Sequence, residues 1–368
     1  MASIYQRNNK IYISWYDFKS GKVKSKSLKL EATSANLRKA NKIKAEFELS
    51  LETEKRKLNS LGIERKTLGS AFKHFLDNNS SKRPKTIKDY HRFFNLFKQS
   101  FNPDSLCTNI TKLSVEKWIN EIKQLKNKKN GKPLKLNTIY GYQKQLNHFL
   151  NFLFEYSYTP MFKINKDVKA KRELTEKIIF NKHDLIKIFD GLDEKSSGFR
   201  AAVNILYYTG LRPSDILSIK KENINLEERT IKYYSLKRKM HREIPFHSCL
   251  LDIFRERISS TDNWIVPYAK SEHLGRALKR YLKLLDLSNK KYTPYTFRKT
   301  FFTFARANGI RDEVVRELIG HAQDSVGNIH YNVITIESMF TELELFPTIS
   351  SIKDELEKKN NLKSSNNS

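Results

Sequence analysis

The stretch YTPYTFRKTFFTFARANG, at residues 292–309, decides how the second half of the chain is interpreted. Pro294 can open a helix, because its ring fixes φ near the helical value and the first turn needs no amide hydrogen from it. Arg298 then lies inside that helix. A guanidinium is planar, permanently charged and able to bind two oxygens at once.

Three more segments carry basic or nucleophilic candidates. They are TGLRPSDIL (209–217) with Arg212, TIKYYSLKRKMHREIPF (230–246) with Lys237, and ELIGHAQDSVGNIHYN (317–332) with His321 and Tyr331. We expect Arg212 at a helix start, beside a glycine and a proline. Lys237 is expected near the turn of a strand pair.

Across roughly residues 178–335, these four segments resemble the catalytic boxes of the tyrosine recombinase, or phage integrase, family, in the family's order. Any one box is weak evidence, but the combination is specific. The resemblance implies an enzyme, a site-specific DNA recombinase that cuts and rejoins strands through a 3′-phosphotyrosyl intermediate. It also implies a role in integrating or excising a mobile element. Because the phosphotyrosyl link stores the energy of the broken bond, no cofactor and no metal is expected.

The family's roles carry over to individual residues. In the family two arginines, here Arg212 and Arg298, grip the scissile phosphate, and a lysine, here Lys237, protonates the leaving 5′ oxygen. A histidine, here His321, hydrogen-bonds the phosphate, and the attacking tyrosine is here Tyr331. An acidic residue, here Asp215, supports the site. Lys237 stands eight residues before Pro245, which is the spacing of the family's hairpin lysine. Cations suit this chemistry, because negative charge accumulates on the non-bridging oxygens in the transition state.

The chain departs from the family pattern in two places. Tyr295 occupies the position of the histidine in the usual HxxR box, which here reads YTFR. A phenol donates a hydrogen bond to phosphate but is a poor general base near neutral pH. Ten residues, where nine is commoner, lead from His321 to Tyr331. Removal of the Tyr331 proton therefore depends on water, on His321 or on cations that lower the phenol pKa.

Each candidate also has an ordinary structural explanation. A lone arginine on a helix is usually a surface residue, and an aspartate in a first helical turn is favoured by the helix dipole alone. The alternatives are a surface position for Arg212, a dipole role for Asp215, Lys239 in place of Lys237, a helix cap for His321, a core position for Tyr331, and Tyr292 or Tyr295 as the nucleophile. The occurrence of four boxes in one order weakens these alternatives together.

The charge of the chain points to a polyanionic partner. Lysine and arginine number 69 against 40 acidic residues, a formal net charge of +29, and the isoelectric point is about 9.8. Double-stranded DNA fits best, because each neutralised phosphate also releases counterions. A general bias toward basic residues in the source organism is the plain alternative.

Several classes of protein are disfavoured by composition. Cys107 and Cys249 lie far apart and form no CxxC or Cys/His cluster, so neither a disulfide framework nor a zinc motif is expected. No apolar run reaches transmembrane length, the N-terminus has no apolar signal region, and the mean hydropathy is −0.63. We expect a soluble, cytoplasmic protein without a membrane partner.

The expected fold is multidomain, mainly α with α+β parts. Its parts are a small β-sheet-plus-helix, arm-type DNA-binding module at 1–60, a helical core-binding (SAM-like) domain at 65–158, a basic linker at 159–177, a mixed α/β catalytic domain at 178–346, and a loose polar tail at 347–368. Thr67 and Ser114 are expected at helix starts, and Pro84 is expected as a first helical residue. The segment at 339–346 could pack on its own domain or on a neighbouring subunit.

Basic residues outside the boxes are candidate DNA contacts. They are Lys22, Lys24 and Lys26 on one face of a strand, Lys128 and Lys129 in a loop, and Lys169, Lys171 and Arg172 in the linker. The resemblance implies a homotetramer on DNA, with accessory DNA-bending or directionality proteins as further candidate partners. Two other functions stay open, a type IB-like topoisomerase and a catalytically decayed DNA-binding repressor.

Overall fold

The fold is multidomain and mainly α-helical, with two small antiparallel sheets, as the sequence predicted. The computed structural model describes residues 2–17, 22–60, 64–127, 130–321 and 334–365. The chain divides into two compact units, residues 1–175 and 176–368. No helix in the described ranges combines the length and the apolar character needed to span a membrane.

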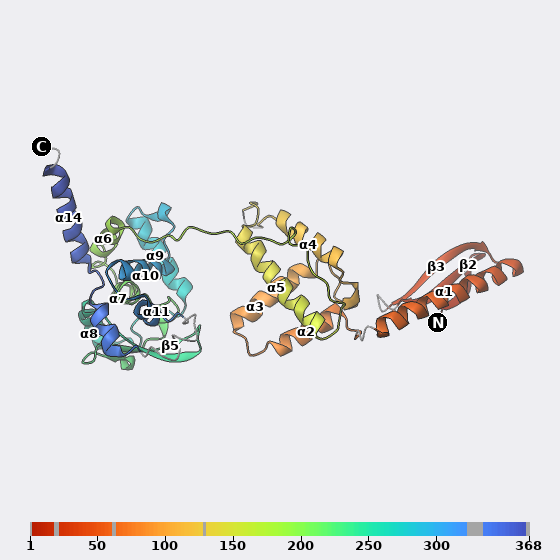
Figure 1. Ribbon diagram of the computed structural model, residues 1–368, viewed down its shortest axis with the longest axis horizontal. Coiled ribbons are helices and arrows are strands. Elements are labelled where there is room, and N and C mark those ends of the chain that lie inside the picture. Colours follow the sequence, from red (N-terminus) through yellow and green to blue (C-terminus); the bar gives the residue numbers. More distant parts are fainter. Residues whose placement is uncertain (1, 18–21, 61–63, 128–129, 322–333, 366–368) are drawn as a thin grey trace. The chain divides into compact units, whose positions relative to one another are not determined.

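The N-terminal part of the first unit is a three-stranded sheet with one helix. Strands β1 (Ala2–Arg7), β2 (Lys10–Asp17) and β3 (Lys22–Glu31) are antiparallel in that order. Helix α1 (Ser34–Ser60) runs along one face of the sheet (Figure 1). Ile11 and Ile13 of β2 are buried on the side of the helix, because alternate residues of a strand face opposite sides.

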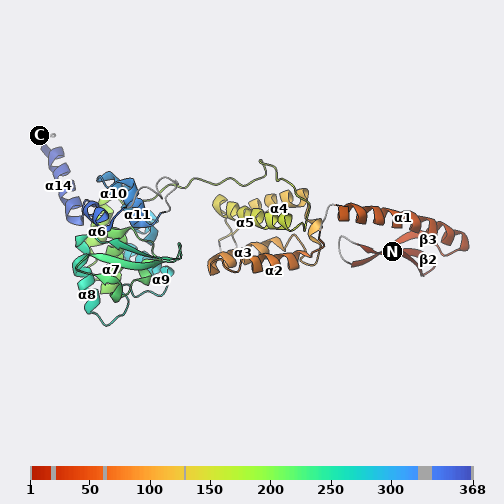
Figure 2. The ribbon, with the colours of Figure 1, turned by 60° about the horizontal axis from the view of Figure 1, so that its bottom comes forward.

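The rest of the first unit is a four-helix bundle (Figure 2). Its helices are α2 (Leu68–Asn78), α3 (Pro84–Phe97), α4 (Lys112–Gln124) and α5 (Leu136–Glu155), with a 3₁₀ turn, η1 (Cys107–Asn109), before α4. Helix α5 contacts the other three helices. The core is aromatic, and its largest fully buried side chains are Phe75, Phe93, Phe97, Trp118 and Phe149.

The helix starts of the bundle follow the sequence, with one correction. Thr67 accepts a hydrogen bond from the backbone of Ser70, at 3.3 Å, and caps α2, and Pro84 is the first residue of α3, as predicted. Ser114, however, is not the cap of α4. Thr111 occupies that position, and the Ser114 hydroxyl accepts from the Thr111 backbone N–H at 3.0 Å. A reciprocal capping box explains the difference, because it uses both hydroxyls to pair exposed N–H groups.

Much of the expected linker at 159–177 packs onto the bundle. Ile164 and Ala170 are about nine-tenths buried and belong to the bundle core. The backbone N–H and C=O of Glu173 bond to the side chain of Asn137, both at 3.1 Å. The chain is therefore held on the bundle as far as residue 173.

The second unit is a mixed α/β domain. Its helices are α6 (Lys182–Asp190), α7 (Ser197–Thr209), α8 (Leu251–Ser259), α9 (Ser271–Leu284), α10 (Pro294–Ala307), α11 (Asp312–Ile319), α13 (Ile336–Leu343) and α14 (Ile349–Ser365). Its sheet is β4 (Ile224–Asn225), β5 (Thr230–Ser235) and β6 (Met240–Pro245), and short 3₁₀ turns are η2 (Ile216–Ser218), η3 (Lys221–Asn223), η4 (Ser248–Leu250) and η5 (Ser288–Lys290).

Helices α7 and α10 pack together at the centre of this unit. The end of α7 is set by Gly210, whose φ of +60° is left-handed. A Cβ atom at Gly210 would lie 2.5 Å from the ring of Phe301 on α10. Glycine is needed here both for the backbone conformation and for the close approach of the two helices.

The C-terminal region is more ordered than the loose tail expected at 347–368. Helix α13 packs on β6 and α11 of its own chain, with Met339 and Leu343 buried. Helix α14 then packs on α6 through Ile352, which is 1% exposed. Lys353 reaches Asp190 at 2.6 Å. Ile349 and Leu356 pack on the same core, so positions 349, 352 and 356 form an apolar stripe at helical spacing that the expectation of a loose tail overlooked.

We expect Gly210→Ala to lower the free energy of unfolding by about 2–4 kcal/mol, because it combines a left-handed alanine with a steric overlap. Urea denaturation measures the change. The matched control is Gly275→Ala, which lies within α9 and has its nearest neighbour, a Pro294 carbon, 4.0 Å from the added Cβ. This control should raise stability by about 0.5–1 kcal/mol, since alanine is the better helix former. Equal effects of the two substitutions would contradict the packing argument.

Candidate active site

Arg298 is held rigidly on α10 beside the end of α7. Its side chain is 2% exposed, and Nη1 donates to the carbonyl oxygen of Gly210 at 3.0 Å. Nη2 is buried and has no hydrogen-bond partner within the described residues. Burial, and then repulsion from Arg212, lowers the Arg298 pKa to about 10, although Tyr295 and Asp215 oppose the shift. The site therefore holds a guanidinium that lacks part of its solvation.

Arg212 follows the end of α7, and the expected position at a helix start is wrong. The residue lies in the turn between Gly210 and η2, because the left-handed glycine has already ended the helix. Its Nη2 donates to the Gly320 carbonyl oxygen at 3.1 Å, and Nη1 donates to Asp215 Oδ2 at 3.3 Å. Its Nε is buried without a partner among the described residues. Arg212 is thus held through both of its Nη atoms.

Asp215 acts through Arg212 and not through a helix dipole. It is fully buried, with 0% exposure. The turn that follows it, η2, has three residues and makes no long helix whose dipole could attract a carboxylate. A buried carboxylate is stable when it is paired, and the Arg212 guanidinium supplies the pair. Asp215 therefore fixes the orientation of Arg212.

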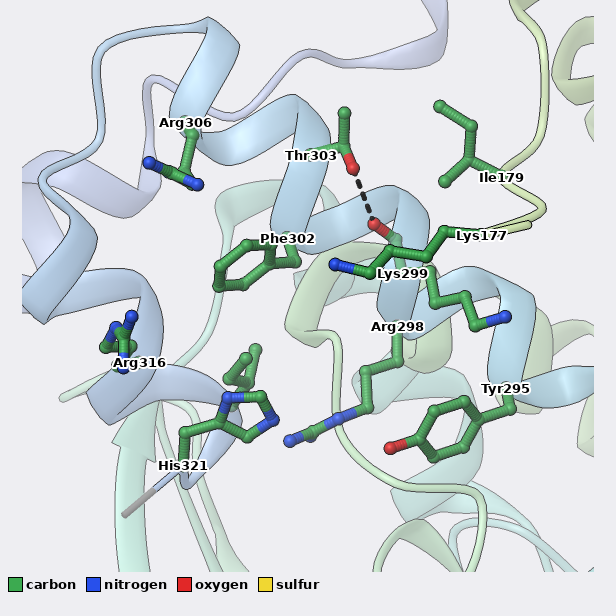
Figure 3. A pocket seen from close by; sticks show the side chains of 11 residues that line it. Lys177, Ile179, Tyr295, Arg298, Lys299, Phe302, Thr303, Arg306, Arg316 and His321 are labelled. Carbon is green, nitrogen blue, oxygen red and sulfur yellow. Dashed lines mark hydrogen bonds between the residues drawn. The ribbon is translucent and has the colours of Figure 1, made fainter. Parts of the chain in front are cut away.

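His321 enters the site from the end of α11. Gly320, with φ of +66°, ends the helix, and the His321 backbone N–H donates to the Arg316 carbonyl at 2.9 Å. The imidazole ring reaches toward the Arg298 guanidinium (Figure 3). Burial lowers the His321 pKa first, and the charges of Arg298 and Arg212 lower it further. The neutral ring predominates at pH 7, where it can donate one hydrogen bond.

Lys237 lies in the turn between β5 and β6, as the sequence predicted. Its side chain is exposed, and its charge contributes to the lowered pKa of His321, so it lies near the imidazole. The neighbouring alternative, Lys239, has a left-handed φ of +56° and ends the same turn. Lys237 therefore stays the predicted lysine of the site, and Lys239 stays its alternative.

Tyr295 faces the same cleft as Arg298 and His321. In Figure 3 its hydroxyl is directed toward the Arg298 guanidinium. The hydroxyl raises the Arg298 pKa, although it is not a hydrogen-bond partner of Arg298 Nη2. Tyr295 is 44% exposed, so its hydroxyl remains accessible to a ligand.

The cleft beside these residues has a volume of about 550 Å³, and it is lined by further basic residues that the sequence analysis did not predict. Its further cationic lining residues are Lys177, Lys299, Arg306 and Arg316. On α10 the lining positions are 295, 298, 299, 302, 303 and 306, which are the spacings of one helix face. That periodicity was visible in the sequence and could have identified Lys299 and Arg306.

The predicted nucleophile, Tyr331, lies outside the described residues. One of the two alternative nucleophiles, Tyr292, is hydrogen-bonded to another residue. The Tyr292 hydroxyl donates to Asp184 Oδ2 at 2.6 Å, and burial, followed by the Asp184 carboxylate, raises the Tyr292 pKa to about 12. A phenol in that environment resists the deprotonation that nucleophilic attack requires. Tyr295 remains the described tyrosine that faces the cleft.

The lysines of β3 share a face, but that face is the one on which α1 packs. Lys24 lies opposite Trp15 and Lys26 opposite Ile13, and residues directly opposite in antiparallel strands point to the same side. Trp15 meets Phe47 of α1 edge-on, at 4.9 Å between ring centroids. Both lysines are exposed, because β3 is an edge strand. They therefore present charge along the edge of the sheet.

The open face of this sheet is aromatic and polar. Tyr5 and Tyr12 stack there at 5.4 Å, and Tyr16 is 45% exposed. The strand parity that we used for the lysines could also have located these tyrosines. Of the remaining basic candidates, Lys169, Lys171 and Arg172 are exposed, whereas Lys128 and Lys129 lie outside the described residues.

No group of three or more His, Cys, Asp or Glu side chains in the described ranges is arranged to hold a metal ion. What the described residues of the second unit do bring together is cationic. Arg212, Arg298 and His321 come from three different segments, and they lie close enough for the Arg212 charge to lower the pKa of Arg298 and for both arginine charges to lower the pKa of His321. Such an arrangement can bind and polarise a phosphate group.

Comparisons with known proteins show what the chain is similar to. Residues 179–335 match the model of the phage integrase family. A tyrosine recombinase of Thermosipho africanus is 24% identical over 257 residues, covering 67% of this chain and 86% of the relative. The tyrosine recombinase XerD of Listeria innocua is 25% identical over 282 residues, covering 71% of this chain and 92% of the relative.

Two solved structures share the fold. A lambda integrase tetramer bound to a Holliday junction is 18% identical, with a TM-score of 0.55, and covers 90% of this chain and 98% of its own. The Tn1549 transposon integrase in complex with circular intermediate DNA is 16% identical, with a TM-score of 0.57, and covers 74% of this chain and 97% of its own. Residues 179–335 therefore belong to the phage integrase family, and the chain, like its tyrosine recombinase relatives, is a DNA breaking and rejoining enzyme.

Proposed function

We propose that the chain is a site-specific recombinase that integrates or excises a mobile element through a 3′-phosphotyrosyl intermediate on Tyr331. The observation that carries the proposal is the pair of buried arginines, each with an N–H group that lacks a partner in the described structure. A buried donor without an acceptor is costly, and a phosphodiester oxygen supplies the missing acceptor. Arg212 and Arg298 would bind the scissile phosphate from two sides.

The other site residues have complementary roles in this mechanism. The Tyr331 oxygen attacks phosphorus, the bond from phosphorus to the 5′ oxygen breaks, and Lys237 gives that oxygen a proton. Neutral His321 and the Tyr295 hydroxyl donate hydrogen bonds to non-bridging oxygens. The charges of the two guanidiniums favour the Tyr331 phenolate, which matters because neither Tyr295 nor His321 in a cationic field is a strong base.

The same proposal assigns DNA contacts to the remaining parts of the chain. The basic residues at 169–172 are exposed and suit contacts with the phosphate backbone, since charge contacts of this kind need no base sequence. The edge-strand lysines of the N-terminal module would bind a second, arm-type site. A homotetramer on DNA, with directionality or DNA-bending proteins as helpers, is proposed by analogy with the lambda integrase tetramer on its junction.

A covalent trap tests the chemistry. A DNA duplex nicked next to the cut site loses the leaving strand after cleavage, so an active enzyme should accumulate a protein–DNA adduct on a denaturing gel. We expect Tyr331→Phe to form no adduct, because it lacks the attacking oxygen, while its affinity for DNA stays within about twofold of the original.

Controls separate the neighbouring tyrosines and the alternative functions. Tyr292→Phe should still form the adduct, and peptide mapping should find the DNA on Tyr331. An adduct on Tyr295 would reject the assignment. A chain that binds DNA but never forms an adduct would be a decayed repressor, and relaxation of supercoiled DNA without paired sites would indicate a topoisomerase.

Salt dependence tests the phosphate contacts independently. If the protein engages roughly six to ten phosphates, its affinity for a core-site duplex should fall about 10³ to 10⁵-fold between 50 and 200 mM salt, owing to counterion release. Fluorescence anisotropy measures this change. A flat response would reject a protein that grips the DNA backbone, without bearing on Tyr331.

Deletion of residues 1–60 tests the arm-site role. The shortened chain should lose binding to arm-site DNA and keep cleavage of the core site, because the catalytic residues all lie after residue 200. Gel-shift and covalent-trap assays on the two DNA sites give the comparison. Arm-site affinity that survives the deletion would exclude this module as its source.

A further inference from the structure

Arg242, on β6, is a third buried arginine beside the site, and the mechanism above gives it no role. It is 8% exposed and pairs across the sheet with Tyr233 of β5. Its Nη1 donates to the Tyr233 hydroxyl at 3.1 Å. Its Nη2 donates to the Glu317 backbone carbonyl at 2.6 Å and also forms an ion pair with the Glu317 carboxylate. One guanidinium thus joins the hairpin strands to the last turn of α11.

Gly320 shows how tightly this joint is packed. A Cβ atom at Gly320 would lie 2.3 Å from Arg242 Nη1, so the guanidinium rests directly against the glycine. The carbonyl oxygen of the same glycine accepts from Arg212. The end of α11 is therefore fixed on one side by a phosphate-binding arginine and on the other by Arg242.

The hairpin that Arg242 fastens carries Lys237. The turn at 236–239 joins β5 to β6, and Arg242 is the third residue of β6. Strand β6 lies at the edge of its sheet and pairs only with β5 among the described strands. The Lys237 side chain lies at an exposed turn of an edge hairpin, so its position depends on how firmly the two strands are held. The contacts of Arg242 with Tyr233 and Glu317 hold them.

We propose that Arg242 is a positioning residue that anchors the Lys237 hairpin to α11, and so places the Lys237 ammonium at the leaving 5′ oxygen. The inference rests on the proposed function. Arginine suits the role because its planar fork serves a phenol, a carbonyl and a carboxylate at once, which a lysine ammonium on a flexible stem does not. Arg242 acts on the reaction through Lys237 and does not touch the phosphate.

Changing the leaving group distinguishes a positioning role of Arg242 from a general structural role. An alkoxide needs a proton to leave, whereas a thiolate leaves without one because thiols are far more acidic than alcohols. Nicked duplexes with oxygen or with sulfur at the 5′ bridging position therefore differ in their need for Lys237. Single-turnover adduct formation by the full chain would be measured on both.

We expect Arg242→Lys to slow cleavage of the oxygen duplex about 10²-fold, because a displacement of about 1 Å has an effect of that size. Cleavage of the sulfur duplex should stay within about threefold of the original chain, as should DNA affinity. Glu317→Gln should show the same pattern more weakly, since it keeps the backbone acceptor and loses the charge. If Arg242→Lys fails to fold, Glu317→Gln tests the same contact. Arg255→Lys, a change at an exposed arginine paired with Asp252, should cleave both duplexes normally.

Each other outcome has a definite meaning. Equal loss on both duplexes, or no loss on either, overturns the role of Arg242. Lys237→Ala is the reference, and it should lose cleavage of the oxygen duplex and keep that of the sulfur duplex. If the unaltered chain forms no adduct on either duplex, the proposed function fails, and this result is distinct from a failure of the inference about Arg242.

Discussion

Two buried guanidiniums, held by the backbone carbonyls of two glycines, are the constraint on which the second unit is built. Arg298 is fixed by Gly210 and Arg212 by Gly320, at 3.0 and 3.1 Å. Burial removes water from both charges, and each repels the other, as the lowered pKa of Arg298 shows. Asp215 offsets part of this cost, but it contacts Arg212 and leaves donors on both arginines without partners in the described structure. Among the described residues, these donors remain available to a bound anion, and the cost of bringing the two guanidiniums together is met during folding.

This constraint explains why two glycines stand at helix ends. A carbonyl can point at a guanidinium only where the helix has stopped, because inside a helix it is already bonded to an N–H four residues on. A left-handed residue stops the helix within one step, and both glycines have φ near +60°. Side chains are also excluded sterically, by Phe301 at Gly210 and by Arg242 at Gly320. The end of one helix therefore serves as the acceptor for an arginine that comes from elsewhere in the chain.

The order of the boxes made the residue types of the site predictable, and it also predicted the helix of Arg298 and the hairpin of Lys237. What it could not supply were relationships set by tertiary contact. Arg212 was expected at a helix start, because the local sequence contains a proline, yet the packing of Gly210 against Phe301 makes the same segment a helix end. The lysines of β3 were correctly placed on one face by parity, but parity does not reveal which face a helix covers. That fact comes from the pairing of Lys24 and Lys26 with Trp15 and Ile13.

The same electrostatic argument accounts for the tyrosine in the YTFR box. In a site that depended on a titrating imidazole at this position, its replacement by a phenol would remove the base. Here burial, followed by the charges of Arg298 and Arg212, lowers the pKa of the remaining imidazole, His321, and the pKa of a second imidazole beside Arg298 would be lowered for the same reasons. A neutral imidazole and a phenol then offer the same thing to a phosphate, a single hydrogen-bond donor. In the proposed mechanism, the permanent charges of Arg212 and Arg298 would do what a base otherwise does, because they would stabilise the Tyr331 phenolate directly. The substitution changes the identity of a donor and leaves the electrostatic basis of the site in place.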